Sequence, residues 1–86
     1  MKYRVVIPPS VEKEIRNLPW SVANRLYHRI IKLEGVPRPS GIRPLAGGMF
    51  WRIRSGDYRI IFEIDDKHGI VSLSRVRHRK DACRGL

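Results

Sequence analysis

The stretch that decides the fold reads FWRIRSGDYRIIFEI and spans residues 50–64. From residue 51 its side chains alternate between apolar and basic, which is the period-2 pattern of a strand with one buried face. A Ser-Gly-Asp triplet at residues 55–57 supplies a tight hairpin loop. The alternation resumes in residues 58–64, where three apolar side chains share one face. We therefore predict two antiparallel strands, residues 49–54 and 58–64, joined by a hairpin.

The segment that follows predicts a further turn and a last strand. Residues 65–69 read Asp-Asp-Lys-His-Gly, a turn composition, and residues 70–76 are again rich in strand-forming residues. If Val71 and Leu73 face the core, strict alternation would bury Arg75 and Arg77 as well. Because an unpaired buried charge is costly, we predict that the strand bulges or ends near Arg75. A short basic tail, residues 79–86, follows.

The first half of the chain has a helical period instead. Residues 3–7 are rich in β-branched side chains and precede Pro8-Pro9, so they predict a short strand. Ser10 suits a helix N-cap. A second helix is predicted to begin at Pro19 and to stop at Gly35, before the turn-rich segment 35–41. The apolar positions of the two helices are Val11, Ile15 and Leu18 in the first, and Val22 or Ala23, Leu26, Ile30 and Leu33 in the second.

This order of elements predicts an α+β fold, in which an N-terminal strand and two helices pack on one face of a small antiparallel meander. A length of 86 residues fits a single domain over residues 1–86. One cysteine excludes a disulfide framework and a zinc site built on several thiolates. The longest apolar runs are three residues, against the roughly 20 that a membrane-spanning helix needs. With no secretory leader at its start, the chain is expected to be cytoplasmic.

The charge points to a polyanionic partner. The formal net charge is +10, and the cations are 13 arginines against 5 lysines. The planar guanidinium group binds phosphate through two hydrogen bonds, whereas lysine acts as a point charge. A basic surface that serves only solubility is the alternative, but solubility does not require arginine in place of lysine.

Three of the arginines are predicted to share one face of the hairpin. Alternation turns Arg52 and Arg54 away from the predicted core, and Arg59 lies on the same face of the neighbouring strand. Cross-strand neighbours are only about 5 Å apart, so these cations repel one another unless an anion lies among them. The alternative is a solvated sheet face on which the charges splay apart.

Residues 50–64 resemble the signature of the RelE/ParE superfamily of type II toxins, in which an aromatic residue, alternating basic residues and a Gly-Asp-Tyr-Arg turn recur. Residues 75–81 are similar to the last strand and tail of that family, and Leu45 lies where the family has a leucine before a turn. The order of the predicted elements also agrees, so the resemblance spans essentially the whole chain.

The resemblance implies a toxin that an antitoxin holds inactive and that cleaves mRNA in the ribosomal A site without a metal or another cofactor. In that reaction a ribose 2′-OH attacks the adjacent phosphate and leaves a cyclic phosphate and a free 5′-OH. The RelE branch has its basic catalytic residues at the positions of Arg52, Arg54, Arg59 and Arg79. The last two match the family in identity, whereas the first two replace lysines and cannot readily accept a proton.

The general base stays open between two candidates. Members of the family often have a tyrosine shortly after the basic cluster, and this chain has Cys83 near that point. The basic neighbours of Cys83 would favour its thiolate. His78 is the other candidate, since the unperturbed pKa of histidine, about 6.5, permits both proton roles. A buried structural thiol and a surface histidine are the simpler readings.

Further residues are expected to bind nucleic acid or to be structural. Those expected to contact RNA are Phe50, Arg75, Arg77, Lys80 and Arg84. We interpret Tyr3 and Trp20 as core or helix-junction residues, and the second helix is expected to turn Arg25, Arg29 and Lys32 outward. His68 with Asp65 and Asp66 imitates a metal site only weakly, so no metal is expected.

Three functions therefore remain. The favoured one is the ribosome-dependent endoribonuclease, with the ribosome, mRNA and an acidic antitoxin as partners. The second is a ParE-like inhibitor of DNA gyrase, which shares the fold. The third is a basic nucleic-acid-binding module without catalysis.

Overall fold

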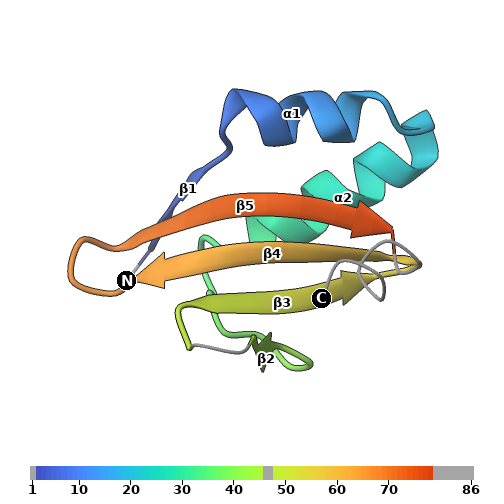
Figure 1. Ribbon diagram of the computed structural model, residues 1–86. Helices are drawn as coiled ribbons and strands as arrows, with labels where there is room; N and C mark the ends of the chain where they lie inside the picture. The colour runs from blue at the N-terminus through green and yellow to red at the C-terminus, as the bar shows by residue number, and fades with distance from the viewer. Residues whose placement is uncertain (1, 46–47, 79–86) are drawn as a thin grey trace.

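The computed structural model describes residues 2–45 and 48–78. Two helices lie on one face of a five-stranded sheet, so the fold class is α+β, as the sequence predicts (Figure 1). No described helix is long and apolar enough to span a membrane. The elements in chain order are β1 Arg4–Val6, α1 Pro9–Arg16, α2 Trp20–Lys32, β2 Arg43–Pro44, β3 Phe50–Ser55, β4 Tyr58–Asp65 and β5 Ile70–His78.

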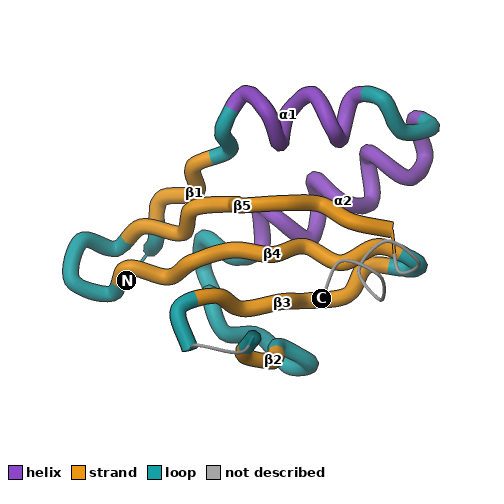
Figure 2. The backbone as a smooth tube through the Cα atoms, in the orientation of Figure 1, coloured by secondary structure: helices purple, strands orange, loops and turns teal. Residues whose placement is uncertain are grey.

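The sheet has the strand order β1-β5-β4-β3-β2 (Figure 2). Strands β3, β4 and β5 form the predicted antiparallel meander. Strand β1 lies beside β5 and runs parallel to it, so the sheet is mixed. At the opposite edge, the two-residue strand β2 pairs with β3, and this strand was not predicted.

Each helix begins at proline: α1 at a pair of prolines and α2 at a single one. Helix α1 has Pro8 at its N-cap and Pro9 inside its first turn, so Ser10 is not the N-cap that the sequence predicted. The fixed φ of proline suits the first helical position, which moves the start of the helix ahead of the serine. Helix α2 has Pro19 as its N-cap and ends at Lys32, three residues before the predicted stop.

The core lies between the helices and one face of the sheet. The predicted apolar stripe of α2 is confirmed, with Ala23 as its first member. Trp20 does not belong to the core, because it is 79% exposed; as the first residue of α2 it lies at the junction of the two helices. The buried core residues are Val11, Ile15, Ala23, Leu26, Ile30, Leu33, Ile53, Ile60, Phe62, Val71, Leu73 and Val76.

A β-bulge in β5 keeps Arg75 and Arg77 out of the core, where strict alternation would place them. Ile61 pairs with Arg75 and Phe62 pairs with Leu73, so Ser74 is the extra residue. One extra residue moves every later side chain to the other face of the sheet. The bulge therefore places Val76 in the core and turns Arg75 and Arg77 to the helix-free face. The predicted bulge is confirmed, and the strand continues to His78.

Candidate nucleic-acid interface

A row of three arginines crosses the helix-free face of the sheet. Arg54 of β3 pairs with Arg59 of β4, and Arg59 pairs with Arg77 of β5. The adjacent cross-strand row, which runs from Ile53 to Val76, is buried under the helices. Because neighbouring rows face opposite sides, the three guanidinium groups lie on the side that the helices leave uncovered. We call these three residues the arginine row.

A second basic row lies parallel to the first. Arg43 pairs with Arg52, Arg52 with Ile61, and Ile61 with Arg75, so the row crosses all strands from β2 to β5. The next row on the same face pairs Phe50 with Glu63. The face thus presents six arginines in two rows, bordered by one aromatic side chain.

Within the described residues, no ion pair neutralises either row. The three ion pairs found there join Arg16 to Glu12, Arg38 to Asp66 and His68 to Asp65. Arg59, at the centre of the arginine row, is half-buried, and its Nε is buried without a hydrogen-bond acceptor. Like charges directly opposite on a sheet repel, and an unpaired buried donor is costly. A bound anion would relieve both, so the face suits a phosphate group.

His78 lies on the other side of the sheet from the arginine row. Its ring meets that of Tyr58 edge-on, with centroids 5.2 Å apart. Tyr58 packs against the hydrophobic core, and it is the direct cross-strand partner of His78. The structure thus brings Arg52, Arg54 and Arg59 together but separates His78 from them.

Four of the predicted site residues lie outside the described part of the chain. They are Arg79, Lys80, Cys83 and Arg84.

The basic region includes two further arginines, which the sequence patterns did not place there. Arg29 was predicted to point outward, but it is half-buried and its Nη2 donates to the carbonyl oxygen of Arg54 at 3.0 Å. Arg43 belongs to β2, and a strand of two residues has no periodicity that a sequence pattern could detect. Arg25 and Lys32 are exposed, as predicted.

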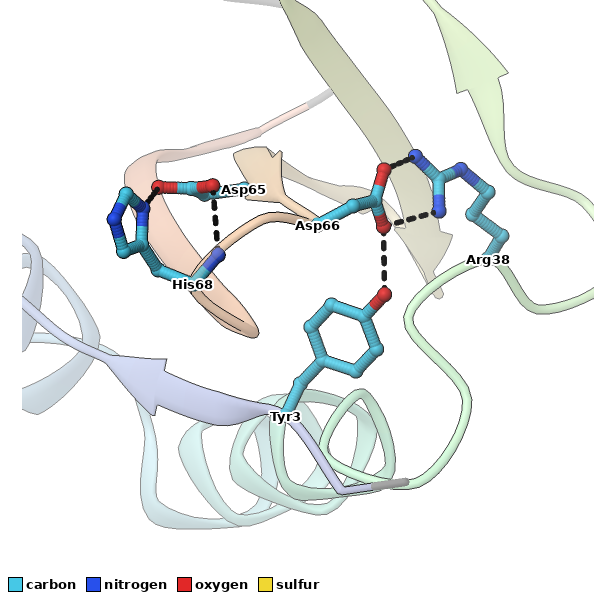
Figure 3. A network of polar contacts seen from close by, with 5 residues as sticks. All are labelled: Tyr3, Arg38, Asp65, Asp66 and His68. Carbon is cyan, nitrogen blue, oxygen red and sulfur yellow. Dashed lines mark hydrogen bonds and ion pairs between the residues drawn. The ribbon is translucent and has the colours of Figure 1, made fainter.

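A polar cluster fixes the segment between α2 and β2 against the sheet (Figure 3). Arg38 donates two hydrogen bonds to the Asp66 carboxylate, at 3.0 and 2.8 Å, and the Tyr3 hydroxyl donates a third at 2.6 Å. The Arg38 guanidinium also lies over the Trp51 ring, 5.4 Å from its centroid. The hydrogen bonds from Arg38 and Tyr3 lower the pKa of Asp66 to about 2. The bond to Asp66 raises the pKa of Tyr3.

Within the β4–β5 turn, His68 contacts Asp65. The backbone N–H of His68 donates to Asp65 at 3.1 Å, and its ring Nδ1 lies 2.8 Å from the other carboxylate oxygen (Figure 3). These bonds lower the pKa of Asp65. Among the described residues, no three potential metal ligands come together.

Comparison with known proteins gives the family. Residues 5–83 match the family model for the ParE toxin of the type II toxin–antitoxin system parDE. Among curated proteins, no sequence matches this chain at a significant level.

Solved toxin structures share the fold. RelE in the archaeal RelE–RelB complex from Pyrococcus horikoshii is 29% identical, with a TM-score of 0.82 over 92% of this chain and 97% of that one. The RelBE2 toxin–antitoxin complex from Mycobacterium tuberculosis contains a chain that is 26% identical, with a TM-score of 0.81 over 92% of this chain and 100% of that one. A RelE mutant from E. coli in the free state is 25% identical, with a TM-score of 0.75 over 98% and 90%.

Proposed function

The chain belongs to the ParE toxin family of type II toxin–antitoxin systems, and we propose that this toxin cleaves mRNA on the ribosome. In this proposal it enters the ribosomal A site, needs no metal and acts in the cytoplasm, where translation takes place. The observation that carries the proposal is the arginine row with the second basic row beside it.

The chemistry requires cations at the scissile phosphate. When the ribose 2′-OH attacks, the O2′–P bond forms and the P–O5′ bond breaks, which leaves a cyclic phosphate and a 5′-OH. The phosphorane between these states carries more negative charge than the diester. Groups already aimed at that charge contribute most to such catalysis. Arg59 fits this role because it is held on a strand between two other arginines.

The remaining roles follow from position and charge. Arg54 and Arg52 lie beside Arg59 and would hold the scissile phosphodiester and the phosphate next to it. The resemblance to the RelE branch adds Arg79 to this group. Phe50, on the same face as Arg52, would stack on a base. Arg75 and Arg77 would bind the RNA backbone, together with Lys80 and Arg84 of the tail.

The proton acceptor is a separate question, because arginine does not readily give up its proton. His78 is turned toward Tyr58 on the helix side of the sheet. This placement favours Cys83, or a group of the ribosome, over His78 as the acceptor of the 2′-OH proton.

A second candidate function rests on the family match itself. The model that matches residues 5–83 is that of the ParE toxin, and the resemblance gives the ParE-like branch as an inhibitor of DNA gyrase. The fold does not separate the two branches, whereas the basic sheet face favours the nuclease.

We also propose that an acidic antitoxin is the cognate partner. The similar toxins from Pyrococcus horikoshii and Mycobacterium tuberculosis are in complexes with their antitoxins. A net charge of +10 would attract an acidic chain electrostatically. Trp20 and Ile31 of α2, 79% and 60% exposed, are eleven residues apart and so lie on one side of the helix. They offer an apolar contact on the helix side of the sheet, in addition to the charged contact on the other face.

Expression without an antitoxin, followed by mapping of 5′ ends in cellular RNA, tests the function. Codon-phased cuts within translated mRNA are expected. Double-strand DNA breaks with intact mRNA would instead establish the gyrase inhibitor. Normal growth with both nucleic acids intact would leave a non-catalytic binding module.

A further inference from the structure

A recess of about 410 Å³ opens at the edge of the sheet, beside strand β3. Its lining comes from three parts of the chain: helix α2, strand β2 with the segment that leads into it, and strand β3. Of the six lining residues, four are arginines and none carries a negative charge. They are Arg29, Gly41, Arg43, Arg52, Ile53 and Arg54.

The recess exists because β2 covers only part of the β3 edge. The two strands pair at Arg43 with Arg52 and at Pro44 with Trp51, and the pairing stops there. Beyond that point the carbonyl oxygen of Arg54 accepts a hydrogen bond from the Arg29 side chain instead of from a strand. A side chain of the helix layer is thereby held at the edge of the sheet.

The hydrogen bonds of Arg29 are incomplete. Its Nη2 is used by the Arg54 carbonyl, while its Nε is buried and has no acceptor in the described protein. Arg43, which also lines the recess, is exposed and makes no ion pair within the described residues. An anion in the recess would therefore meet several unused guanidinium donors with no competing carboxylate.

We propose that this recess is a second phosphate subsite, which binds a phosphodiester of the same RNA strand beside the one on the arginine row. This inference rests on the proposed function. Arg52 and Arg54 connect the two places, since their side chains lie on the helix-free face and the β3 edge between them lines the recess. Neighbouring strands are about 4.8 Å apart, so the recess lies roughly two strand spacings from Arg59. An RNA strand that crosses β4 and β3 carries its next phosphates past this edge.

Binding of a short RNA measures the subsite without requiring cleavage. The probe is a fluorescein-labelled hexaribonucleotide with 2′-O-methyl groups throughout, titrated with the free toxin at several salt concentrations. Arg29→Gln removes the charge and keeps a polar side chain, whose amide ends two bonds short of Nη2. We expect roughly tenfold weaker binding. The slope of log K against log salt should fall by about 0.7, the value for one phosphate of a single strand. Arg43→Gln should have the same effect.

Two variants control for folding and for general charge. Arg29→Lys retains the charge and should retain most of the salt slope. Arg25→Gln lies one helical turn away on α2 and does not line the recess, so its affinity and slope should match the wild type. Thermal melting of each variant shows that the fold is intact. If Arg29→Gln and Arg25→Gln bind the probe equally, the proposal is overturned.

Two further arms identify the occupant. If inorganic phosphate stabilises the wild type but not Arg29→Gln while RNA affinity is unchanged, the recess takes a free phosphate and not RNA. If Arg29→Gln weakens only antitoxin binding, the recess belongs to the protein partner, which also overturns the proposal. Cleavage on programmed ribosomes is scored separately. A wild type that fails to cut but binds RNA through Arg29 would refute the nuclease function while the subsite stands.

Discussion

Arg54 and Arg59 face each other across the β3–β4 hairpin, one residue pair away from its turn. Nothing in the described protein neutralises them. The third member of the row, Arg77, lies directly across from Arg59 on the other side. Such an arrangement opposes folding, because like charges in direct cross-strand contact destabilise a sheet. It is understandable as a binding surface that a polyanion completes.

Relief of this repulsion should stabilise the free protein. Arg54→Gln should raise the free energy of unfolding by about 0.2–1 kcal/mol, the range of cross-strand pair effects. The gain should shrink as salt is added, because screening weakens the repulsion in the wild type. Urea unfolding at low and high salt measures it. Arg16→Gln, which removes an exposed charge of α1, is the control, and an equal gain there would show that only net charge matters.

The facing of the residues after the bulge should matter more to the fold than the bulge itself. Deletion of Ser74 makes the pairs Phe62–Leu73 and Ile61–Arg75 consecutive, so no later side chain changes face and the cost should be small. An alanine inserted between Arg75 and Val76 instead carries Arg77 toward the core, and because an unpaired buried charge is among the most damaging changes, we expect a loss of about 3 kcal/mol or more. Circular dichroism and urea unfolding measure both variants. If the deletion costs as much as the insertion, the facing of the side chains is not the cause.

The Arg38–Asp66–Tyr3 cluster should make stability depend on acid pH. The pKa of Asp66 is lowered from 3.8 to about 2 in the folded protein. A lowered carboxyl pKa stabilises the fold fully above the unfolded value, and this contribution is lost as the pH falls from about 4 to about 2. Asp66→Asn should be less stable than the wild type at neutral pH and equal to it near pH 2. Urea midpoints across this range test the difference; a constant gap would show that the carboxylate charge is not responsible.

A group other than His78 should accept the proton of the 2′-OH. Since that ring packs edge-on against Tyr58 on the helix side, His78→Gln should change the cleavage rate by only a few-fold. Cys83→Ser should lower it strongly if the thiolate accepts the proton, and iodoacetamide should then inactivate the wild type. Single-turnover cleavage measures both variants. If His78→Gln loses cleavage while it still binds the ribosome, His78 is the proton acceptor and this prediction is wrong.

Sequence periodicity was sufficient to predict β3, β4 and β5, which carry five of the six arginines of the basic face. The alternation from Trp51 to Arg54 and after Tyr58 fixed which side chains face the helices, because a half-buried strand tolerates only one register. The same reasoning predicted that β5 had to bulge or end near Arg75. It could not locate the extra residue at Ser74, since a bulge depends on pairing with β4 that one strand alone does not reveal.

Contacts between distant segments could not be predicted from sequence patterns. The parallel pairing of β1 with β5 and the short strand β2 both depend on where the chain returns after the helices. Arg29 has an outward position by helical period, yet its length lets it reach the uncovered β3 edge. Trp20 was considered for the core because large aromatic residues are usually buried, whereas its place at the helix start leaves it exposed.

Cleavage on programmed ribosomes by Arg59→Ala tests the central claim most directly. Arg59 is held on β4 between two other arginines, so alanine removes a fixed charge from where the phosphorane develops. We expect single-turnover cleavage of A-site mRNA to fall by about 10²-fold or more, as for the loss of one oxyanion donor. Arg79→Ala should fall similarly, Arg52→Lys should be milder, and Arg16→Ala should cut like the wild type. If Arg59→Ala and Arg79→Ala both cut at the wild-type rate, the nuclease assignment fails and gyrase inhibition becomes the better explanation.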